Sequence, residues 1–176
     1  MTGPRFDRSP QTRIRSLGEP GDLGWVVMRH GESYAAEYGW DATFEALVVR
    51  IVADYAATPG PAREAAWIAE LDGQRVGCVF CVAATGDTAQ LRPLLVDPAA
   101  RGHRLGARLV DECLGFARQA GYRRMTLWTN HPLAAARHIY LARGFALTAE
   151  EPHHSYGADL IVQTYDLDLT AAAARS

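Results

Sequence analysis

Lysine is absent from this sequence of 176 residues, and all 18 of its basic residues are arginine. A phosphate-binding loop that ends in Gly-Lys is therefore excluded, which leaves a nucleoside triphosphatase without support. Cysteine is scarce too, because Cys78, Cys81 and Cys113 are too few for a disulfide framework and three thiols cannot pair completely. This usage indicates a reducing compartment, and we expect a cytoplasmic protein.

Two further absences concern partners. No apolar run approaches the roughly 20 residues that cross a bilayer, and the N-terminal residues lack the apolar core of a signal peptide. We therefore expect no membrane association. The formal net charge of −2 gives no basic excess, so nucleic acid is not an expected partner.

The sequence also lacks the patterns of metal sites and hydrolases. Cys78 and Cys81 have no second cysteine pair, and His153-His154 lacks the helical spacing with a glutamate that zinc proteases show. No Gly-X-Ser-X-Gly motif is present. The sequence therefore predicts no metal and no hydrolase triad.

The composition is that of one ordinary globular domain. Apolar residues make up 48% of the chain and charged residues 22%. A chain of this length can bury a sizeable core. We expect disordered tails over residues 1–12 and 171–176, on either side of a single domain over 13–170.

Hydrophobic periodicity and turn signals predict the order of the elements. Glycines that interrupt a helical pattern after Asp22 predict a broken or bent helix, and a cleaner stripe predicts a second helix that Asp41 caps. Asp72-Gly73 between two apolar runs predicts a hairpin. The other expected elements are strands at 13–17, 90–96, 125–129, 160–169 and from 144, and helices at 104–121 and 132–143. The prediction is an α+β (mixed α/β) domain with about seven strands and four helices.

A strand that leads into a glycine-containing turn and then a helix is the most informative pattern. It reads Leu94-Leu95-Val96-Asp97-Pro98-Ala99-Ala100-Arg101-Gly102-His103-Arg104-Leu105-Gly106-Ala107. The first N–H groups of a helix lack intrahelical partners and lie at the positive end of its dipole, so they can hold a pyrophosphate without lysine. The alternative is that Gly102 and Gly106 serve only close packing.

This stretch resembles motif A of the GNAT family of acyl-CoA-dependent N-acyltransferases. Downstream, Leu127-Trp128-Thr129-Asn130, Ala135-Ala136-Arg137-His138-Ile139-Tyr140 and Arg143-Gly144-Phe145 are similar to the family's motif B. Segments 22–27, 37–40, 107–121 and 150–155 look like the acetyltransferase half of fusions between MarR-type regulators and GNAT domains. The resemblance implies one GNAT domain with a central, mostly antiparallel, splayed sheet.

The resemblance also implies acetyl-CoA as the cosubstrate. In the family, the strand before motif A separates from its neighbour at a bulge, and the pantetheine arm pairs with the exposed edge. Pro93 independently favours a bulge because it cannot donate a ladder hydrogen bond, although it would also suit a plain strand end. The expected cofactor-binding residues are Leu94, Leu95, Val96, Arg101, Gly102, His103, Arg104, Leu105, Gly106, Ala107 and Asn130.

Tyr140 matches the family tyrosine that protonates or hydrogen-bonds the departing CoA thiolate. A phenol, with an ordinary pKa of about 10, stays protonated at neutral pH, as a general acid must. The alternative is a half-buried tyrosine that only packs beside Phe145.

Three positions depart from the family pattern. Arg104 stands where a middle glycine is usual, and it could either hinder close approach of the cofactor or add a cation facing its phosphates. Leu133 replaces a frequent asparagine, for which Asn130 could substitute. Gln90 takes the place of the glutamate base of histone-type relatives, and a glutamine cannot accept the proton.

By resemblance, the acceptor cleft is bordered by segments that mix aromatic, acidic and histidine residues. They would suit a small cationic or aromatic amine through charge pairing and cation–π contact, and equally an ordinary amphipathic lid. The expected acceptor-binding residues are Glu32, Tyr34, Glu37, Tyr38, Trp40, His153, His154 and Tyr156, and the candidates for the base are the carboxylates and histidines among them.

These patterns predict an enzyme that moves an acetyl group from acetyl-CoA to a primary amine by direct attack in a ternary complex. Small molecules, peptide N-termini and protein lysines all remain open as acceptors. The alternative is a non-catalytic acyl-CoA-binding regulatory domain, because the relatives are often fused to regulators and the base position is Gln90. A homodimer is an expectation that rests only on the frequency of dimers among relatives.

Overall fold

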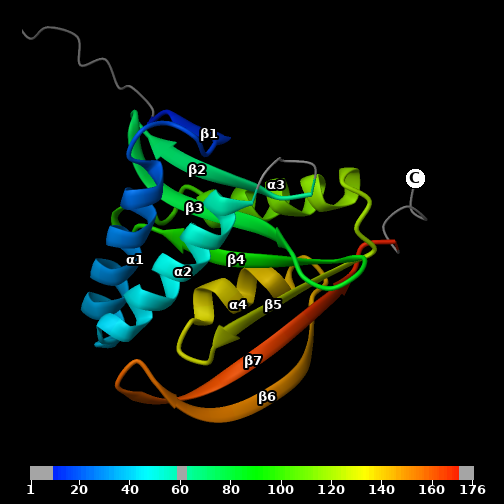
Figure 1. Ribbon diagram of the computed structural model, residues 1–176. Helices are drawn as coiled ribbons and strands as arrows, with labels where there is room; N and C mark the ends of the chain where they lie inside the picture. Colours follow the sequence, from blue (N-terminus) through cyan, green and yellow to red (C-terminus); the bar gives the residue numbers. More distant parts are fainter. Residues whose placement is uncertain (1–9, 59–62, 171–176) are drawn as a thin grey trace, which may run out of the picture.

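The computed structural model describes residues 10–58 and 63–170. It consists of a seven-stranded sheet with helices on both faces (Figure 1). The strands are β1 (Thr12–Ser16), β2 (Ala65–Leu71), β3 (Gln74–Ala83), β4 (Thr88–Val96), β5 (Arg124–Asn130), β6 (Ala146–Ser155) and β7 (Ala158–Asp168). The helices are α1 (Asp22–Tyr38), α2 (Ala42–Ala57), α3 (Leu105–Gln119) and α4 (Ala134–Leu141), with a 3₁₀ turn at Pro98–Ala100. The predicted order of elements is confirmed. Of the expected tails, residues 1–9 and 171–176 lie outside the described residues.

The sheet has the order β1-β2-β3-β4-β5-β7-β6, and all neighbours are antiparallel except β4 and β5. The parallel pair is short, since Thr88–Gln90 alone pairs with Arg124–Thr126. Beyond Gln90 the two strands separate, as the fold prediction requires. This opening lies near the centre of the sheet (Figure 1).

A bulge in β4 coincides with the opening. On the β3 side, Cys81 pairs with Leu91 and Val79 pairs with Leu94, so two residues of β4 stand opposite one of β3. The two residues are Arg92 and Pro93. Pro93 has no N–H to give to the ladder, and a bulge accommodates that loss. The predicted bulge is confirmed.

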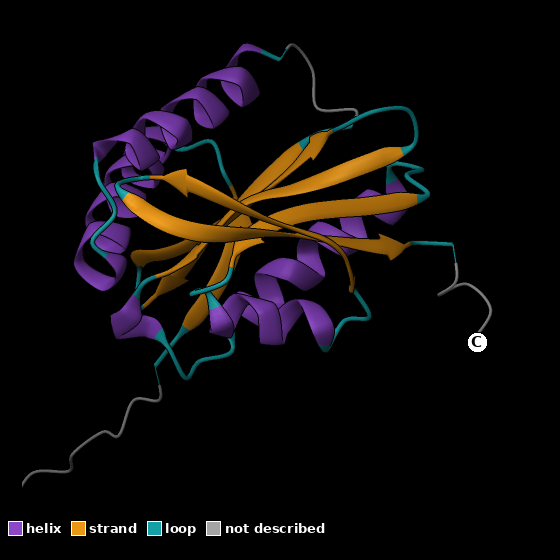
Figure 2. Ribbon diagram, turned by 90° about the horizontal axis from the view of Figure 1, so that it is seen from below, coloured by secondary structure: helices purple, strands orange, loops and turns teal. Residues whose placement is uncertain are grey.

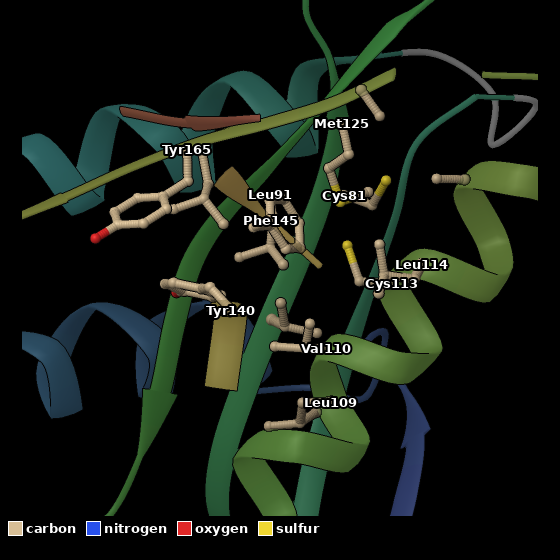
Figure 3. Packing of buried hydrophobic residues seen from close by; sticks show 14 of the residues in the cluster. Cys81, Leu91, Leu109, Val110, Cys113, Leu114, Met125, Tyr140, Phe145 and Tyr165 are labelled. Carbon is tan, nitrogen blue, oxygen red and sulfur yellow. The ribbon is translucent and has the colours of Figure 1, made fainter. Parts of the chain in front are cut away.

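Two hydrophobic clusters fill the two sides of the sheet. Helices α1 and α2 cover one face, and α3 and α4 cover the other (Figure 2). On α3, the buried residues Leu105, Leu109, Cys113 and Ala117 recur every four residues and face the sheet (Figure 3). No helix in residues 10–58 and 63–170 is long and apolar enough to cross a membrane.

Helix α1 is continuous from Asp22 to Tyr38, so the predicted break is wrong, while the alternative of a bend stays a prediction. A Cβ at Gly31 would meet the end of the Glu45 side chain of α2. Gly39, with φ 68°, ends the helix in the left-handed conformation that glycine adopts readily. Gly39 therefore serves helix termination, and Gly31 leaves room for Glu45.

The start of α1 is fixed by a buried carboxylate. Asp22 accepts hydrogen bonds from Arg15 at 2.8 and 3.0 Å and from Arg75 Nε at 2.7 Å. Burial disfavours the charge of Asp22, but these bonds and two from the backbone N–H groups of Gly18 and Glu19 outweigh it and lower its pKa. Through Arg15 on β1 and Arg75 on β3, the helix is held to the sheet.

Several boundaries differ slightly from those expected. Strand β1 begins at Thr12 rather than at residue 13, because Gln11 exchanges two hydrogen bonds with Asp72 in the hairpin turn. The hairpin itself is as predicted, with Asp72 and Gly73 both at positive φ. Helix α4 spans Ala134–Leu141, which is shorter than the expected 132–143.

Candidate functional site

Two adjoining cavities open where β4 and β5 part. The first, here called the turn cavity, has a volume of about 470 Å³ and lies between β4, the turn before α3, and α4. The second, the inner cavity, has a volume of about 80 Å³ and lies between the split strands and the helices α1 and α2. Tyr34, Leu94, Leu133 and Ala136 line both, so the two cavities are neighbours.

The edge of β4 presents free backbone groups to the turn cavity. In an antiparallel ladder, successive residues direct their N–H and C=O groups to opposite sides. Asp97 N donates to Val76 O of β3 at 2.7 Å, so the backbone groups of Asp97 face β3. Leu94 and Val96 are three residues and one residue before Asp97, so their N–H and C=O groups point away from β3. The carbonyl of Leu94 accepts a hydrogen bond from the Tyr34 hydroxyl at 3.4 Å. The strand edge is therefore open to a ligand.

The turn that precedes α3 exposes a row of amides. Gly102 has φ 91°, Arg104 has φ 57°, and the first helical bond runs from Arg108 N to Arg104 O. The N–H groups from Gly102 to Ala107 find no acceptor within the part of the chain that the structure describes. Together with the helix dipole, they form a site suited to a phosphate group.

Gly106 also has a packing role. A Cβ at this position would lie 2.9 Å from Ile139 Cδ1 of α4, so a larger residue would require the Ile139 side chain to shift. Gly102 has open space around it, and its need for glycine comes from its positive φ. The two glycines thus have different structural reasons, and both leave the amides accessible.

Arg104 occupies a backbone conformation in the left-handed region. A glycine adopts this conformation without strain, which is a physical reason for the glycine usual at this position in the family. The Arg104 side chain lines the turn cavity and has no carboxylate within 4 Å among the described residues. Its charge is free to face an anion.

Most of the expected cofactor residues lie together. Those that line the turn cavity are Leu94, Leu95, Val96, Arg101, Gly102, Arg104, Leu105, Gly106 and Ala107. His103 is in the same turn but does not line the cavity, and Asn130 lines the inner cavity instead. Arg101 is engaged by Glu37, with its Nη2 2.6 and 2.7 Å from the carboxylate oxygens.

Tyr140 both packs beside Phe145 and lines a cavity, so the structure agrees with both interpretations of this residue. Its ring is 4% exposed and packs edge-to-face on Phe145 with centroids 5.8 Å apart (Figure 3). It also lines the inner cavity, and its hydroxyl has no hydrogen-bond partner within the described residues. Burial raises the pKa of Tyr140, so the phenol stays protonated.

Aromatic rings form one wall of the inner cavity. Tyr34 contacts Trp40 and Phe44 with ring centroids 5.1 and 4.6 Å apart. Tyr156 packs on Trp40 at 4.9 Å, and its carbonyl accepts a hydrogen bond from Asp41 N. The corner between α1 and α2 is thereby joined to the turn between β6 and β7. Tyr38 lies at the turn cavity rather than at the inner one.

The expected acidic and histidine residues are absent from the inner cavity, although Glu37 lines the turn cavity. Glu32 pairs with Arg29 at 2.7 Å, and Glu37 pairs with Arg101. His154 is exposed and pairs with Asp159. His153 bonds to Asn130 Oδ1 at 3.1 Å and to Ser155, one layer behind the cavity wall. The structure does not bring these four side chains to the inner cavity.

Three polar residues of the inner cavity were not expected from the sequence, namely His30, Arg92 and Thr129. His30 is buried, its Nδ1 donates to Val26 O at 2.8 Å, and its Nε2 has no partner. Burial outweighs that bond and lowers the pKa of His30 to about 4, so the ring is neutral. Arg92 is half-buried in the β4 bulge. A signal was available only for Arg92, which interrupts the otherwise apolar run from Leu91 to Val96.

Gln90 lies outside both cavities. Its Oε1 accepts a hydrogen bond from Arg92 Nη1 at 3.2 Å.

Among residues 10–58 and 63–170, no three histidine, cysteine or acidic side chains are placed to hold a metal ion.

Comparison with known proteins gives consistent matches. Residues 32–145 match the family described as Acetyltransferase (GNAT) family. A Schizosaccharomyces pombe protein named only as an uncharacterised N-acetyltransferase is 32% identical over 147 residues, which are 80% of this chain and 85% of that protein. The amino-acid acetyltransferase of Mycobacterium tuberculosis is 35% identical over 88 residues, 48% of this chain and 51% of the relative.

Solved structures share the fold. An example is a Salmonella typhimurium protein, described as an acetyltransferase and solved with its cofactor acetyl-CoA. It superposes with a TM-score of 0.72 at 20% identity, over 90% of this chain and 94% of the other. The expected splayed, mostly antiparallel architecture is confirmed by this likeness.

Proposed function

Because this chain belongs to the GNAT acetyltransferase family and is an N-acetyltransferase, we propose that it moves the acetyl group of acetyl-CoA directly to a primary amine within a ternary complex. The split between β4 and β5 carries this proposal, since it sets a free strand edge beside a helix start with unpaired amides. The acceptor is an amine of a small molecule or a peptide. The catalytic domain is placed at residues 13–170.

The residues of the turn cavity fit a CoA ester. When bound, acetyl-CoA supplies an acetyl group on a thioester and a thiolate leaving group. The backbone groups of Leu94 and Val96 that point away from β3 are suited to pair with the pantetheine amides and to polarise the thioester carbonyl, with the Leu94 carbonyl giving up its 3.4 Å hydrogen bond from Tyr34. The amides from Gly102 to Ala107 and the charge of Arg104 are suited to the pyrophosphate.

Tyr140 is the residue proposed to donate a proton to the departing sulfur. Its hydroxyl has no partner among the described residues, and burial raises the pKa of this phenol. Both features keep the proton available until a thiolate forms.

The proton of the acceptor ammonium needs a different route. An ammonium cannot attack a thioester, so it must lose a proton first. The inner cavity has no carboxylate among its described lining residues, and Gln90 lies outside it. We therefore assign this deprotonation to water or to the neutral His30, whose unpartnered Nε2 lies in the inner cavity.

The names of the relatives guide the choice of acceptors to test. The Mycobacterium tuberculosis relative acts on amino acids by its name, so amino acids come first, followed by polyamines, aminoglycosides and peptides. The likeness to MarR-type regulator fusions, a cytoplasmic location and a homodimer stay predictions.

The proposal is tested by amine-dependent thiol release from acetyl-CoA in wild type and Tyr140→Phe. The variant should lose about 10²- to 10⁴-fold in kcat, because general acid catalysis contributes that much, while its Kd for acetyl-CoA stays within about threefold. Tyr165→Phe is the matched control, since Tyr165 is a buried tyrosine of the same cluster that lines neither cavity.

Other outcomes would contradict the proposal. Equal losses in both variants would mean that Tyr140 acts only through packing. Calorimetric binding of acetyl-CoA with no thiol release by any amine would favour the regulatory acyl-CoA-binding domain. If acetyl-CoA does not bind at all, the turn cavity is not a site for acetyl-CoA.

A further inference from the structure

We propose that Arg92 binds an anionic group of the acceptor, so that the acceptor is a small amine that also carries a carboxylate or a similar oxyanion. The inference rests on the proposed function, because it concerns the second substrate of the same site. It is carried by the position and the unpaired charge of Arg92 in the inner cavity.

The bulge in β4 sets the position of Arg92. Leu91 lies in the cluster on the α3 side of the sheet, so its neighbour Arg92 projects to the side covered by α1 and α2. There the guanidinium carbon lies 6.0 Å from the centroid of the Trp128 ring on β5. Because β4 and β5 have separated at this level, no ladder covers the space between Arg92 and Trp128.

The charge of Arg92 has no counter-ion. Within the described residues no carboxylate lies within 4 Å of it, Nη1 bonds only to the neutral amide of Gln90, and Nε is buried without a partner. Asp54 of α2 acts on Arg92 from the adjoining hollow but forms no ion pair with it. Burial lowers the pKa of Arg92, yet an arginine stays charged in a protein.

Three other arginines that are withdrawn from solvent show the contrast, whereas the half-buried Arg108 and Arg137 bond to neutral oxygens. Arg15, Arg29 and Arg75 each pair with at least one carboxylate at 2.8 Å or less. A buried charge without a partner is costly to folding, and a protein retains it where a ligand supplies the partner. Arg92 is thus arranged as the receptor of an anion.

The remaining walls define the rest of the acceptor. Trp40, Phe44, Leu47, Ile51 and Trp128 are aromatic or aliphatic, and His30 is neutral. With no acidic residue in the described lining, nothing there attracts a second positive charge. The cavity of about 80 Å³ also includes Tyr140 in its wall, so a small molecule can reach both Arg92 and the reacting end. These features favour an amino-acid-like zwitterion over a polyamine.

The test compares acceptors that differ only in charge. Leucine and phenylalanine are each measured against the corresponding carboxamide and the decarboxylated amine, with kcat/KM for thiol release as the readout. Wild type should prefer the carboxylates by about 10- to 100-fold, the contribution of a charge-assisted hydrogen bond. Arg92→Gln should abolish the preference, and Arg92→Lys should keep part of it.

Two controls isolate the charge of Arg92. Arg118→Gln removes an exposed arginine on α3, which lines neither cavity, and should change nothing. Thermal unfolding shows whether Arg92→Gln is folded, and Arg92→Lys serves where it is not. A wild type without preference for the carboxylates, or an equal loss for all acceptors in Arg92→Gln, would overturn the inference and leave the proposed function standing.

A binding experiment separates the two proposals if no amine releases thiol. Calorimetry then compares N-acetyl-leucine with N-acetyl-leucinamide in the presence of CoA. Binding of the carboxylate form alone, lost in Arg92→Gln, would uphold Arg92 while the transfer proposal fails. Equal binding of both forms, or binding of neither, would overturn the inference.

Discussion

Arg104 shows how one residue can serve a function at a cost to the backbone. Its φ of 57° places an L residue in the region where left-handed geometry costs roughly 1–2 kcal/mol. The side chain lines the turn cavity without an ion-pair partner among the described residues, which supports a contact with the CoA phosphates. Conformation and charge can be separated by substitution.

Arg104→Gly should relieve the strain and remove the charge. We expect the free energy of unfolding to stay unchanged or rise by about 1 kcal/mol, because the relief is partly offset by the greater freedom of glycine in the unfolded chain. The Kd for acetyl-CoA should rise several-fold. Thermal unfolding and calorimetry measure the two effects, and Arg104→Asn, which tolerates this conformation, removes the charge alone. Unchanged affinity in both variants would show that Arg104 does not contact the phosphates.

His30 makes stability depend on pH in a defined window. Its pKa is lowered from 6.5 to about 4 in the folded state, so between these values the unfolded chain binds a proton that the folded chain does not. Stability is therefore constant above pH 6.5 as far as His30 is concerned, and it falls as the pH drops toward 4. At about 1.4 kcal/mol per pKa unit, the loss by pH 4.5 is about 2 to 3 kcal/mol.

Denaturant unfolding of wild type and His30→Asn measures this contribution. The asparagine keeps a donor for Val26 O and cannot titrate. The difference in unfolding free energy between pH 7.5 and 4.5 should be about 2 to 3 kcal/mol smaller in the variant. The same pH dependence in both proteins would show that the histidine is not held neutral by burial.

At the scale of elements, the ion-pair network around Asp22 fixes α1 to the sheet. The Asp22 side chain is fully buried and its partner Arg15 is 7% exposed. Removal of one member of such a network leaves the others buried and uncompensated. We expect Asp22→Asn to lower the free energy of unfolding by about 3 to 5 kcal/mol in urea titrations. Glu19→Gln, which removes an exposed partner of Arg15, should cost less than about 1 kcal/mol, and similar losses in the two variants would contradict the account.

Local signals predicted the elements well where the cause was itself local. Asp72-Gly73 supplies its own turn, Asp41 caps α2 by accepting a bond from Thr43 N, and Pro93 marks the bulge. The break expected in α1 does not occur, and Gly31 instead leaves room for Glu45 of α2. Helix continuity there depends on tertiary packing, which no local periodicity contains.

At the scale of the molecule, the two halves of the candidate site differ in how well the sequence predicts their residues. Apart from Asn130, the expected cofactor residues lie in one continuous stretch, so all of these but His103 fall on one cavity once the strand, turn and helix form. The acceptor half combines α1, α2, β4 and β5, and its pairing partners come from distant segments. Glu37 therefore pairs with Arg101 and does not line the inner cavity, and Arg92 gains its place only because two strands separate.

The central claim is that acetyl-CoA occupies the split between β4 and β5. Amide hydrogen exchange with and without saturating acetyl-CoA tests it most directly. The account predicts slower exchange in peptides that cover residues 94–96 and 102–107, and unchanged exchange in β6, which lies at the far edge of the sheet. Unchanged exchange at 102–107, or slowing confined to other segments, would contradict it.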